Sequence, residues 1–202
     1  MAVFGGEGNP QVNDLAVGAA GFVLVGTEFF DFSERGAVWF SSDGLTWERV
    51  SGSLFGGEYT RVWSVAAGST GFVAAGSAML NHSQAAAVWT SADGVTWSRT
   101  PVVDAASGGG EVSDLAAAGG AIVGVGYAVG KSTGDEQADL DAAVWGFGGR
   151  AWSRILSQEA FGGPGLQDMN SVTAFASCWV ALGSEYISGD SQPVVWMSRS
   201  SG

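Results

Sequence analysis

The sequence is poor in cationic side chains, and this shortage limits the partners that the protein can have. Its 202 residues contain 8 Lys and Arg against 20 Asp and Glu, which gives a formal net charge of -12. A surface of this sign repels phosphate backbones and anionic lipid headgroups. We therefore expect neither nucleic acid nor a membrane surface as a partner.

Cysteine, histidine and long apolar segments are also scarce. The single cysteine, Cys178, cannot form an internal disulfide, and its apolar neighbours predict a buried thiol. The single histidine, His82, has no second histidine or cysteine with which to form a transition-metal site. No apolar run approaches the roughly 20 residues of a membrane-spanning helix. The first residues do not resemble a secretion signal, so composition leaves the compartment open.

The sequence is rich in glycine and apolar residues, and it repeats itself. It has 33 glycines and 46% hydrophobic residues with only 14% charged residues, which is typical of a turn-rich sheet protein. Four motifs recur in a fixed order in four copies. The copies cover approximately residues 12–61, 62–111, 112–168 and 169–202. We treat them as one continuous domain.

The four motifs set the register of the copies. They are a short alternating segment, an apolar run closed by glycine, a Val-Trp pair, and a second tryptophan followed two residues later by arginine. The alternating segments begin at Val12, Val62, Val112 and Met169, at intervals of 50, 50 and 57 residues. The fourth copy stops before its second tryptophan.

Each complete copy holds four short segments rich in Val, Phe, Trp and Thr, separated by Gly, Ser and Asp turns. Such segments predict β-strands, and none shows a helical period over ten or more residues. Four short strands per repeat are typical of a propeller blade. We predict an all-β β-propeller of four tandem four-stranded blades with an incomplete last blade. It forms a four-bladed ring, a half-propeller, or part of a longer array.

A recurrent motif occupies the turn between the third and fourth strands. It reads Ser-Ser-Asp-Gly-Leu-Thr-Trp in the first copy and Ser-Ala-Asp-Gly-Val-Thr-Trp in the second. Serine and aspartate can accept hydrogen bonds from turn amides, glycine supplies a positive φ, and tryptophan covers the turn. The third copy has lost the serine and the aspartate. The structural residues of the motif are Ser41, Asp43, Gly44, Trp47, Ser91, Asp93, Gly94 and Trp97.

This motif resembles the Asp-box of the sialidase-type (BNR) propellers, with one residue fewer between Asp and Trp. The resemblance implies that the box lies opposite the ligand face, so Asp43 and Asp93 are not expected to be catalytic. It also slightly favours an extracellular or periplasmic location. A sialidase would need an arginine cluster, and only Arg35 and Arg61 are placed to reach the ligand face. The tyrosines could supply part of a Tyr/Glu nucleophile pair.

The opposite face carries the loops between second and third strands and the connections between copies. These loops share no sequence, and variable loops on a repeated scaffold are where binding sites occur. We predict a non-enzymatic binding or assembly module for a carbohydrate or protein; the alternative is a sialidase-like glycoside hydrolase or its degenerate relative. The candidate contact residues are Phe29, Phe30, Phe32, Arg35, Tyr59, Arg61, His82, Tyr127 and Tyr186.

The corresponding loop of the third copy is six residues longer and concentrates acidic side chains, namely Asp135, Glu136, Asp139 and Asp141. Oxygen-rich loops can hold Ca²⁺, although the spacing is not that of an EF-hand. A solvated loop without metal is the alternative. We predict no other cofactor.

The incomplete fourth copy leaves a strand edge without a partner, and such edges favour association. We predict a homodimer that joins two four-blade halves. The competing arrangement is a closed monomer in which residues 2–4 pair with the third strand of the last copy.

Overall fold

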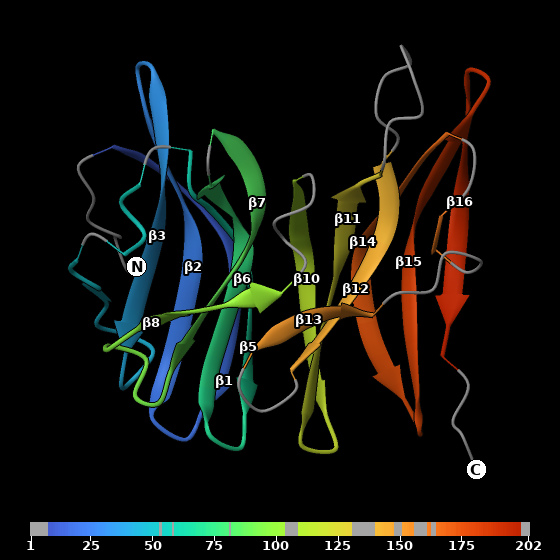
Figure 1. Cartoon of the computed structure of the whole chain (residues 1–202). Coiled ribbons are helices and arrows are strands. Elements are labelled where there is room, and N and C mark those ends of the chain that lie inside the picture. The colour runs from blue at the N-terminus through green and yellow to red at the C-terminus, as the bar shows by residue number, and fades with distance from the viewer. Residues whose placement is uncertain are drawn as a thin grey trace.

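The computed structural model describes residues 8–52, 54–57, 59–80, 82–103, 109–130, 140–147, 151–155, 161–162 and 165–198. Within them the chain forms four sheets that stand side by side in chain order (Figure 1). We call each sheet a blade and number the blades 1 to 4 from the N-terminus. Among the described residues, no helix is long and apolar enough to cross a membrane.

The strands follow the repeat. Blade 1 contains β1 (Asn9–Gly18), β2 (Gly21–Phe30), β3 (Ser33–Ser41) and β4 (Glu48–Arg49). Blade 2 contains β5 (Arg61–Gly68), β6 (Gly71–Leu80), β7 (Ser83–Ser91) and β8 (Ser98–Thr100). Blade 3 contains β10 (Gly110–Ala118), β11 (Ala121–Val129), β12 (Leu140–Phe147), β13 (Trp152–Ile155) and the short β9 (Val102–Val103). Blade 4 contains β14 (Leu166–Phe175), β15 (Cys178–Ile187) and β16 (Asp190–Met197).

The all-β blade architecture and the shorter last blade confirm the sequence prediction. Two details differ. Blade 3 has a fifth strand, because β9 continues from blade 2 and pairs in parallel with β13. The connection between the second and third strands of blade 1, which the sequence predicts as a binding loop, is short, because β2 and β3 are joined through Asp31 and Phe32 alone. The hydrogen-bonded ladder of β2 and β3 extends beyond the apolar core. The strand ends outside the core contain several polar residues, so the sequence pattern does not predict them as strands.

A bulge interrupts every first strand at the same place, directly after Val12, Val62, Val112 and Met169. Opposite each bulge stands the glycine that closes the apolar run of the second strand. A Cβ atom built on Gly26 would collide with the carbonyl oxygen of Gln11, and the equivalent collision occurs in the other three blades. The recurrent glycine is therefore required by the close approach of the bulged strand.

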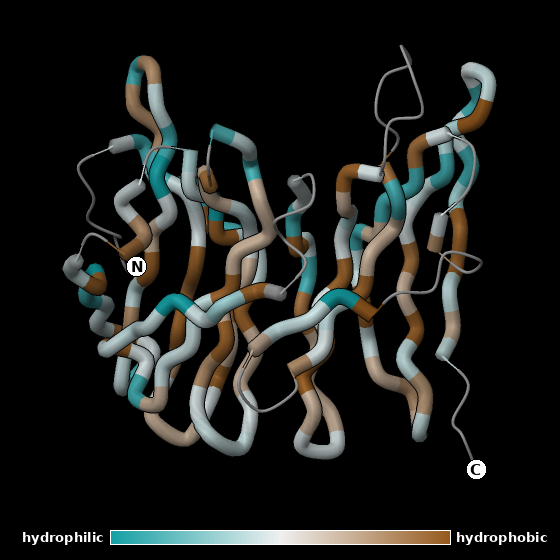
Figure 2. The backbone as a smooth tube through the Cα atoms, in the orientation of Figure 1, coloured by the Kyte–Doolittle hydropathy of each residue, from teal (hydrophilic) through white to brown (hydrophobic). Residues whose placement is uncertain are grey.

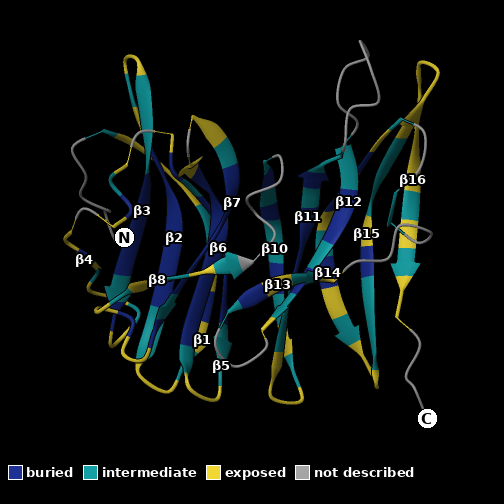
Figure 3. Cartoon of the chain, viewed as in Figure 1, coloured by how far each residue is buried: buried dark blue, intermediate teal, exposed yellow. Residues whose placement is uncertain are grey.

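The apolar core lies between successive blades. Val25 and Val38 of blade 1 pack with Val62 and Val65 of blade 2, and equivalent clusters join blades 2 and 3 and blades 3 and 4. The strands of the row carry hydrophobic stretches along their length (Figure 2). Burial is greatest in the second and third strands of blades 1 and 2 and falls toward β16 (Figure 3). Blades 1 and 4 stand at opposite ends, so the described residues form an open row and not a closed four-bladed ring (Figure 1).

Candidate functional site

The two ends of the strands form two different faces of the row. We call the end at which the first strands begin and the second strands end the loop face, at the top of Figure 1. We call the opposite end, which carries the turns after β3 and β7, the box face. The predicted contact residues belong to the loop face, and the Asp-box motifs belong to the box face.

The turns of blades 1 and 2 that resemble an Asp-box are closed by local hydrogen bonds. In blade 2 the Ser91 hydroxyl accepts the amide of Gly94 at 2.8 Å, and Asp93 accepts the amides of Val95 at 2.9 Å and Thr96 at 2.6 Å. The indole N–H of Trp97 donates to the Gly94 carbonyl at 2.9 Å. Blade 1 repeats the arrangement with Ser41, Asp43, Gly44 and Trp47.

These hydrogen bonds stabilise the charged form of both box aspartates. The amide of Thr96, and then that of Val95, lowers the pKa of Asp93 to about 2. The amides of Thr46 and Leu45 likewise hold the pKa of Asp43 below its usual range. Both carboxylates accept hydrogen bonds from the amides of their own turns, which suits a structural role.

On the loop face, a polar residue precedes the bulge of every first strand. These residues are Gln11, Arg61, Glu111 and Asp168. They occupy equivalent positions on the four first strands, and each first strand contacts the first strand of the next blade. The four residues therefore form a row across the blades. Hydrogen bonds hold the three charged members. Arg61 Nε donates to Glu34 at 2.6 Å, Ser77 donates to Glu111 at 2.8 Å, and Ser184 donates to Asp168.

Tyr127 lies beside this row. It lies on β11 directly opposite Glu111 and is half-buried. Burial, and then the negative charge of Glu111, raises the pKa of the Tyr127 phenol. Arg61 opposes this effect and Asp168 adds to it, so all three charges act on one hydroxyl. We call Glu34, Arg61, Glu111, Tyr127 and Asp168 the mouth cluster.

The mouth cluster combines three carboxylates, one guanidinium and one phenol at the ends of rigid strands. The hydrogen bond to Glu34 raises the pKa of Arg61, which keeps this side chain cationic. Fixed carboxylates accept hydrogen bonds from ligand hydroxyls, and the guanidinium and phenol donate them. The cluster can therefore recognise a ligand that carries several hydroxyl groups.

The structure brings together only some of the residues predicted from the sequence. Arg61 and Tyr127 belong to the mouth cluster, and Tyr59 adjoins it because its amide donates to the Glu34 carbonyl at 2.9 Å. His82 lies in the turn before β7, and Tyr186 lies on β15, where it pairs with Leu166.

A second group of predicted residues lies on the β2–β3 hairpin of blade 1. The Arg35 guanidinium stands 5.0 Å from the centre of the Phe30 ring, in cation–π geometry. Phe32, at the tip, is 93% exposed, and Phe29 is partly exposed. This hairpin is a separate aromatic surface at the end of the row.

Sequence reasoning missed Glu34 and Asp168. The signal for Asp168 was present, since it stands in the same place before the alternating segment as Arg61 and Glu111. Glu34 has no such signal, because the sequence predicts a loop for its segment, and the direction of a loop side chain does not follow from the sequence.

Three of the four residues predicted to bind Ca²⁺, Asp135, Glu136 and Asp139, lie outside the described residues. Asp141 is described and pairs with Ala128 in the β11–β12 ladder. Within the described part of the chain, no group of three or more His, Cys, Asp or Glu side chains is arranged to hold a metal ion. The calcium site stays a prediction.

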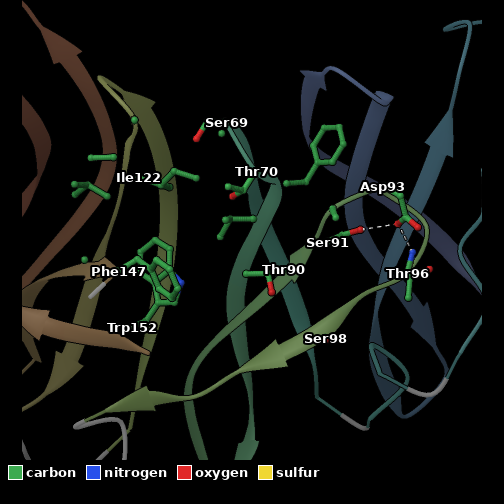
Figure 4. A pocket seen from close by; sticks show the side chains of 18 of the residues that line it. Ser69, Thr70, Thr90, Ser91, Asp93, Thr96, Ser98, Ile122, Phe147 and Trp152 are labelled. Carbon is green, nitrogen blue, oxygen red and sulfur yellow. Dashed lines mark hydrogen bonds between the residues drawn. The ribbon is translucent and has the colours of Figure 1, made fainter. Parts of the chain in front are cut away.

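A cleft of about 950 Å³ opens between blades 2 and 3 on the box face (Figure 4). Hydroxyl side chains of blade 2, including Thr70, Thr90 and Ser98, face Phe147 and Trp152 of blade 3 across it. The indole nitrogen of Trp152 is buried, and within the described part of the chain it has no hydrogen-bond partner. The blade 3 turn has lost its Asp-box, and with it the equivalent of the Trp97 bond to Gly94.

Comparison with solved structures identifies the fold. A GH43_12 protein from a capybara gut metagenome superposes with a TM-score of 0.57 at 14% identity, over 95% of this chain and 40% of that chain. A GH32 beta-fructofuranosidase from Bombyx mori gives a TM-score of 0.50 at 13% identity, over 92% and 46%. The fold is that of a β-propeller. A candidate glycoside hydrolase from Parabacteroides distasonis gives 0.53 at 11% identity, over 88% and 61%.

The likeness to these propellers concerns the fold alone, because the identities are low. This chain spans 40% to 61% of the length of the three neighbours. No protein-family model and no curated protein matches the sequence.

Proposed function

We propose that this propeller is a binding module for a ligand rich in hydroxyl groups, of the carbohydrate class, and that the ligand occupies the mouth cluster. The observation that carries the proposal is the row of Arg61, Glu111 and Asp168 at one position of three neighbouring first strands, with the half-buried Tyr127 paired opposite Glu111. Three blades contribute these groups, as is expected of a site built on a repeated scaffold.

The chemistry of the cluster favours binding over acid–base catalysis. Its carboxylates already accept hydrogen bonds from Arg61, Ser77 or Ser184, which fixes their orientation. Fixed carboxylates and a phenol suit the recognition of neutral sugar hydroxyls, because each acceptor satisfies one donor of the ligand. The Bombyx mori neighbour was crystallised in complex with sucrose, which supports a sugar as the ligand class.

Calorimetric titration against a panel of neutral mono- and oligosaccharides tests this proposal. We expect Glu111→Gln and Asp168→Asn to weaken binding of a positive sugar about 10-fold or more, since each removes a charged acceptor. Tyr127→Phe removes the hydroxyl but keeps the ring. Glu48→Gln, at an exposed carboxylate on β4, is the matched control. Absence of sugar binding, or equal affinities for all four variants, would contradict the proposal.

A second candidate function is glycoside hydrolysis, which the hydrolase neighbours favour. The specific observation is that Glu111 and Asp168 occupy equivalent positions on neighbouring first strands, and most glycosidases use a pair of carboxyl groups. A sialidase-like version lacks support from an arginine cluster, because Arg61 alone among the described arginines belongs to the mouth cluster. Fluorogenic glycosides, a sialoside among them, separate the functions: turnover that Glu111→Gln abolishes would establish the hydrolase.

A further inference from the structure

The end faces of the row expose side chains whose counterparts are core residues in the other blades. On the first strand, Val62, Val112 and Met169 are each 0% exposed, and each packs against the preceding blade. Val12 occupies the same position in blade 1 and is 46% exposed.

The next inward position on the first strand repeats the pattern. Val65, Leu115 and Val172 are 4% to 7% exposed, whereas Leu15 of blade 1 is 50% exposed. Blade 1 therefore presents an apolar surface of the kind that blades 2, 3 and 4 bury against their predecessors. We call Val12 and Leu15 the leading face.

Blade 4 presents the other half of such an interface. Val25, Ala75 and Val125 on the second strands are 0% to 1% exposed, because the following blade covers them. Leu182 occupies this position in blade 4 and is 51% exposed. We call Leu182, together with Val195 on β16, the trailing face.

Val195 extends the trailing face onto the third strand of the blade. Its counterparts Val38 and Val88 are both 0% exposed, whereas Val195 is 66% exposed. The chain thus contains three complete blade interfaces and both halves of a further one, at opposite ends of the row.

We propose that the trailing face of one chain packs against the leading face of a second copy, in the geometry that already joins blades 1 to 4. The interface is head-to-tail, because each half occurs on a different end of the chain. A head-to-tail interface forms a ring when its rotation closes, and in a two-fold dimer the two copies meet through two such seams. This inference does not depend on the ligand of the mouth cluster.

Sedimentation velocity across a micromolar concentration series tests the association. We expect a species of twice the 20.5 kDa chain mass. Leu182→Asp and Leu15→Asp should each raise the dimer dissociation constant about 30-fold or more, because each puts a charge into the centre of a seam. Val95→Asp, in an exposed turn of blade 2, is the control and should leave association unchanged.

Mixing the two face variants distinguishes head-to-tail pairing from pairing of like faces. Leu15→Asp keeps an intact trailing face, and Leu182→Asp keeps an intact leading face. An equimolar mixture should therefore form a heterodimer through one intact seam, whereas each variant alone stays monomeric. Both leucines are half-exposed in the single chain, so the variants should keep the wild-type circular dichroism spectrum.

The proposal is overturned by any of three results. The first is a wild-type monomer at every concentration. The second is self-association that neither face variant weakens. The third is full dimerisation of one variant alone, which would mean that like faces pair. None of these results bears on sugar binding by the mouth cluster, so the two proposals fail separately.

Discussion

The hydroxyl of Ser64 donates a hydrogen bond to the carboxylate of Asp14 across 2.8 Å, and the two residues occupy the same position in consecutive repeats. Ser64 Oγ also lies 3.0 Å from an oxygen of Asp114 in the next blade. A hydroxyl has a single proton, so it donates to one carboxylate at a time. Asp114 in turn accepts the hydroxyl of Ser171 at 3.0 Å. An alternating Asp-Ser chain therefore links the first strands of all four blades.

Ser64→Ala should destabilise the protein by about 1–3 kcal/mol, because it removes the one proton that Asp14 and Asp114 share and the oxygen that accepts the Leu115 amide. Ser113→Ala, on the bulge of β10, is the matched control and should change stability by less than about 0.5 kcal/mol. Urea unfolding monitored by tryptophan fluorescence measures both. Equal midpoints for the two variants would show that the chain of hydrogen bonds does not stabilise the row.

Trp97→Ala should lower the free energy of unfolding by about 2–4 kcal/mol, since the indole packs 5.7 Å from Phe55 and closes the Asp-box turn. Trp47→Ala should cost less, because its bond to the Gly44 carbonyl is longer, at 3.3 Å. Differential scanning calorimetry ranks the two. A larger loss for Trp47→Ala would contradict the role assigned to Phe55.

Acid should weaken the blade 2 box as Asp93 becomes protonated. The pKa of Asp93 is lowered from 3.8 to about 2, so its ionised form contributes stability above about pH 4 and loses it as the pH falls toward 2. In Asp93→Asn this contribution is absent at every pH. The difference in Tm between wild type and Asp93→Asn should therefore shrink as the pH falls through this window, and a constant difference would refute the assignment.

Removing Glu28 alone from the Glu28–Arg49 ion pair should destabilise the protein more than removing both charges. Arg49 Nε and Nη2 reach the two oxygens of the buried Glu28 at 2.9 and 2.6 Å, and fix β4 to the sheet of blade 1. Glu28→Gln should cost about 2–3 kcal/mol, because it leaves a partly buried guanidinium without its counter-ion. Adding Arg49→Met should restore part of the loss. A double-mutant cycle in urea measures the coupling, and simple additivity would disprove it.

The repeat made the blades predictable from the sequence, because Trp, Gly and alternating apolar residues recur at positions where each blade has the same packing. The Asp-box roles of Asp43 and Asp93 followed from local turn chemistry. The mouth cluster was only partly predictable. The sequence predicts Tyr127 and Arg61 as contact residues. Their placement in one cluster depends on the strand bulges and on contacts between blades, and the sequence of a single repeat predicts neither of these features. Glu34 escaped notice because strand ends that lie beyond a core have polar composition.

The short strand β9 has a mechanical consequence. Val102 and Val103 carry the chain from the outermost strand of blade 2 to the outer edge of blade 3, where the Trp152 amide also donates to the Pro101 carbonyl at 3.0 Å. This is a strap across the outside of one joint, and in the part of the chain described no strand crosses the other two joints in this way. Bending therefore concentrates at the joints on either side, and the row behaves as a stiff middle pair of blades with a more pliant blade at each end.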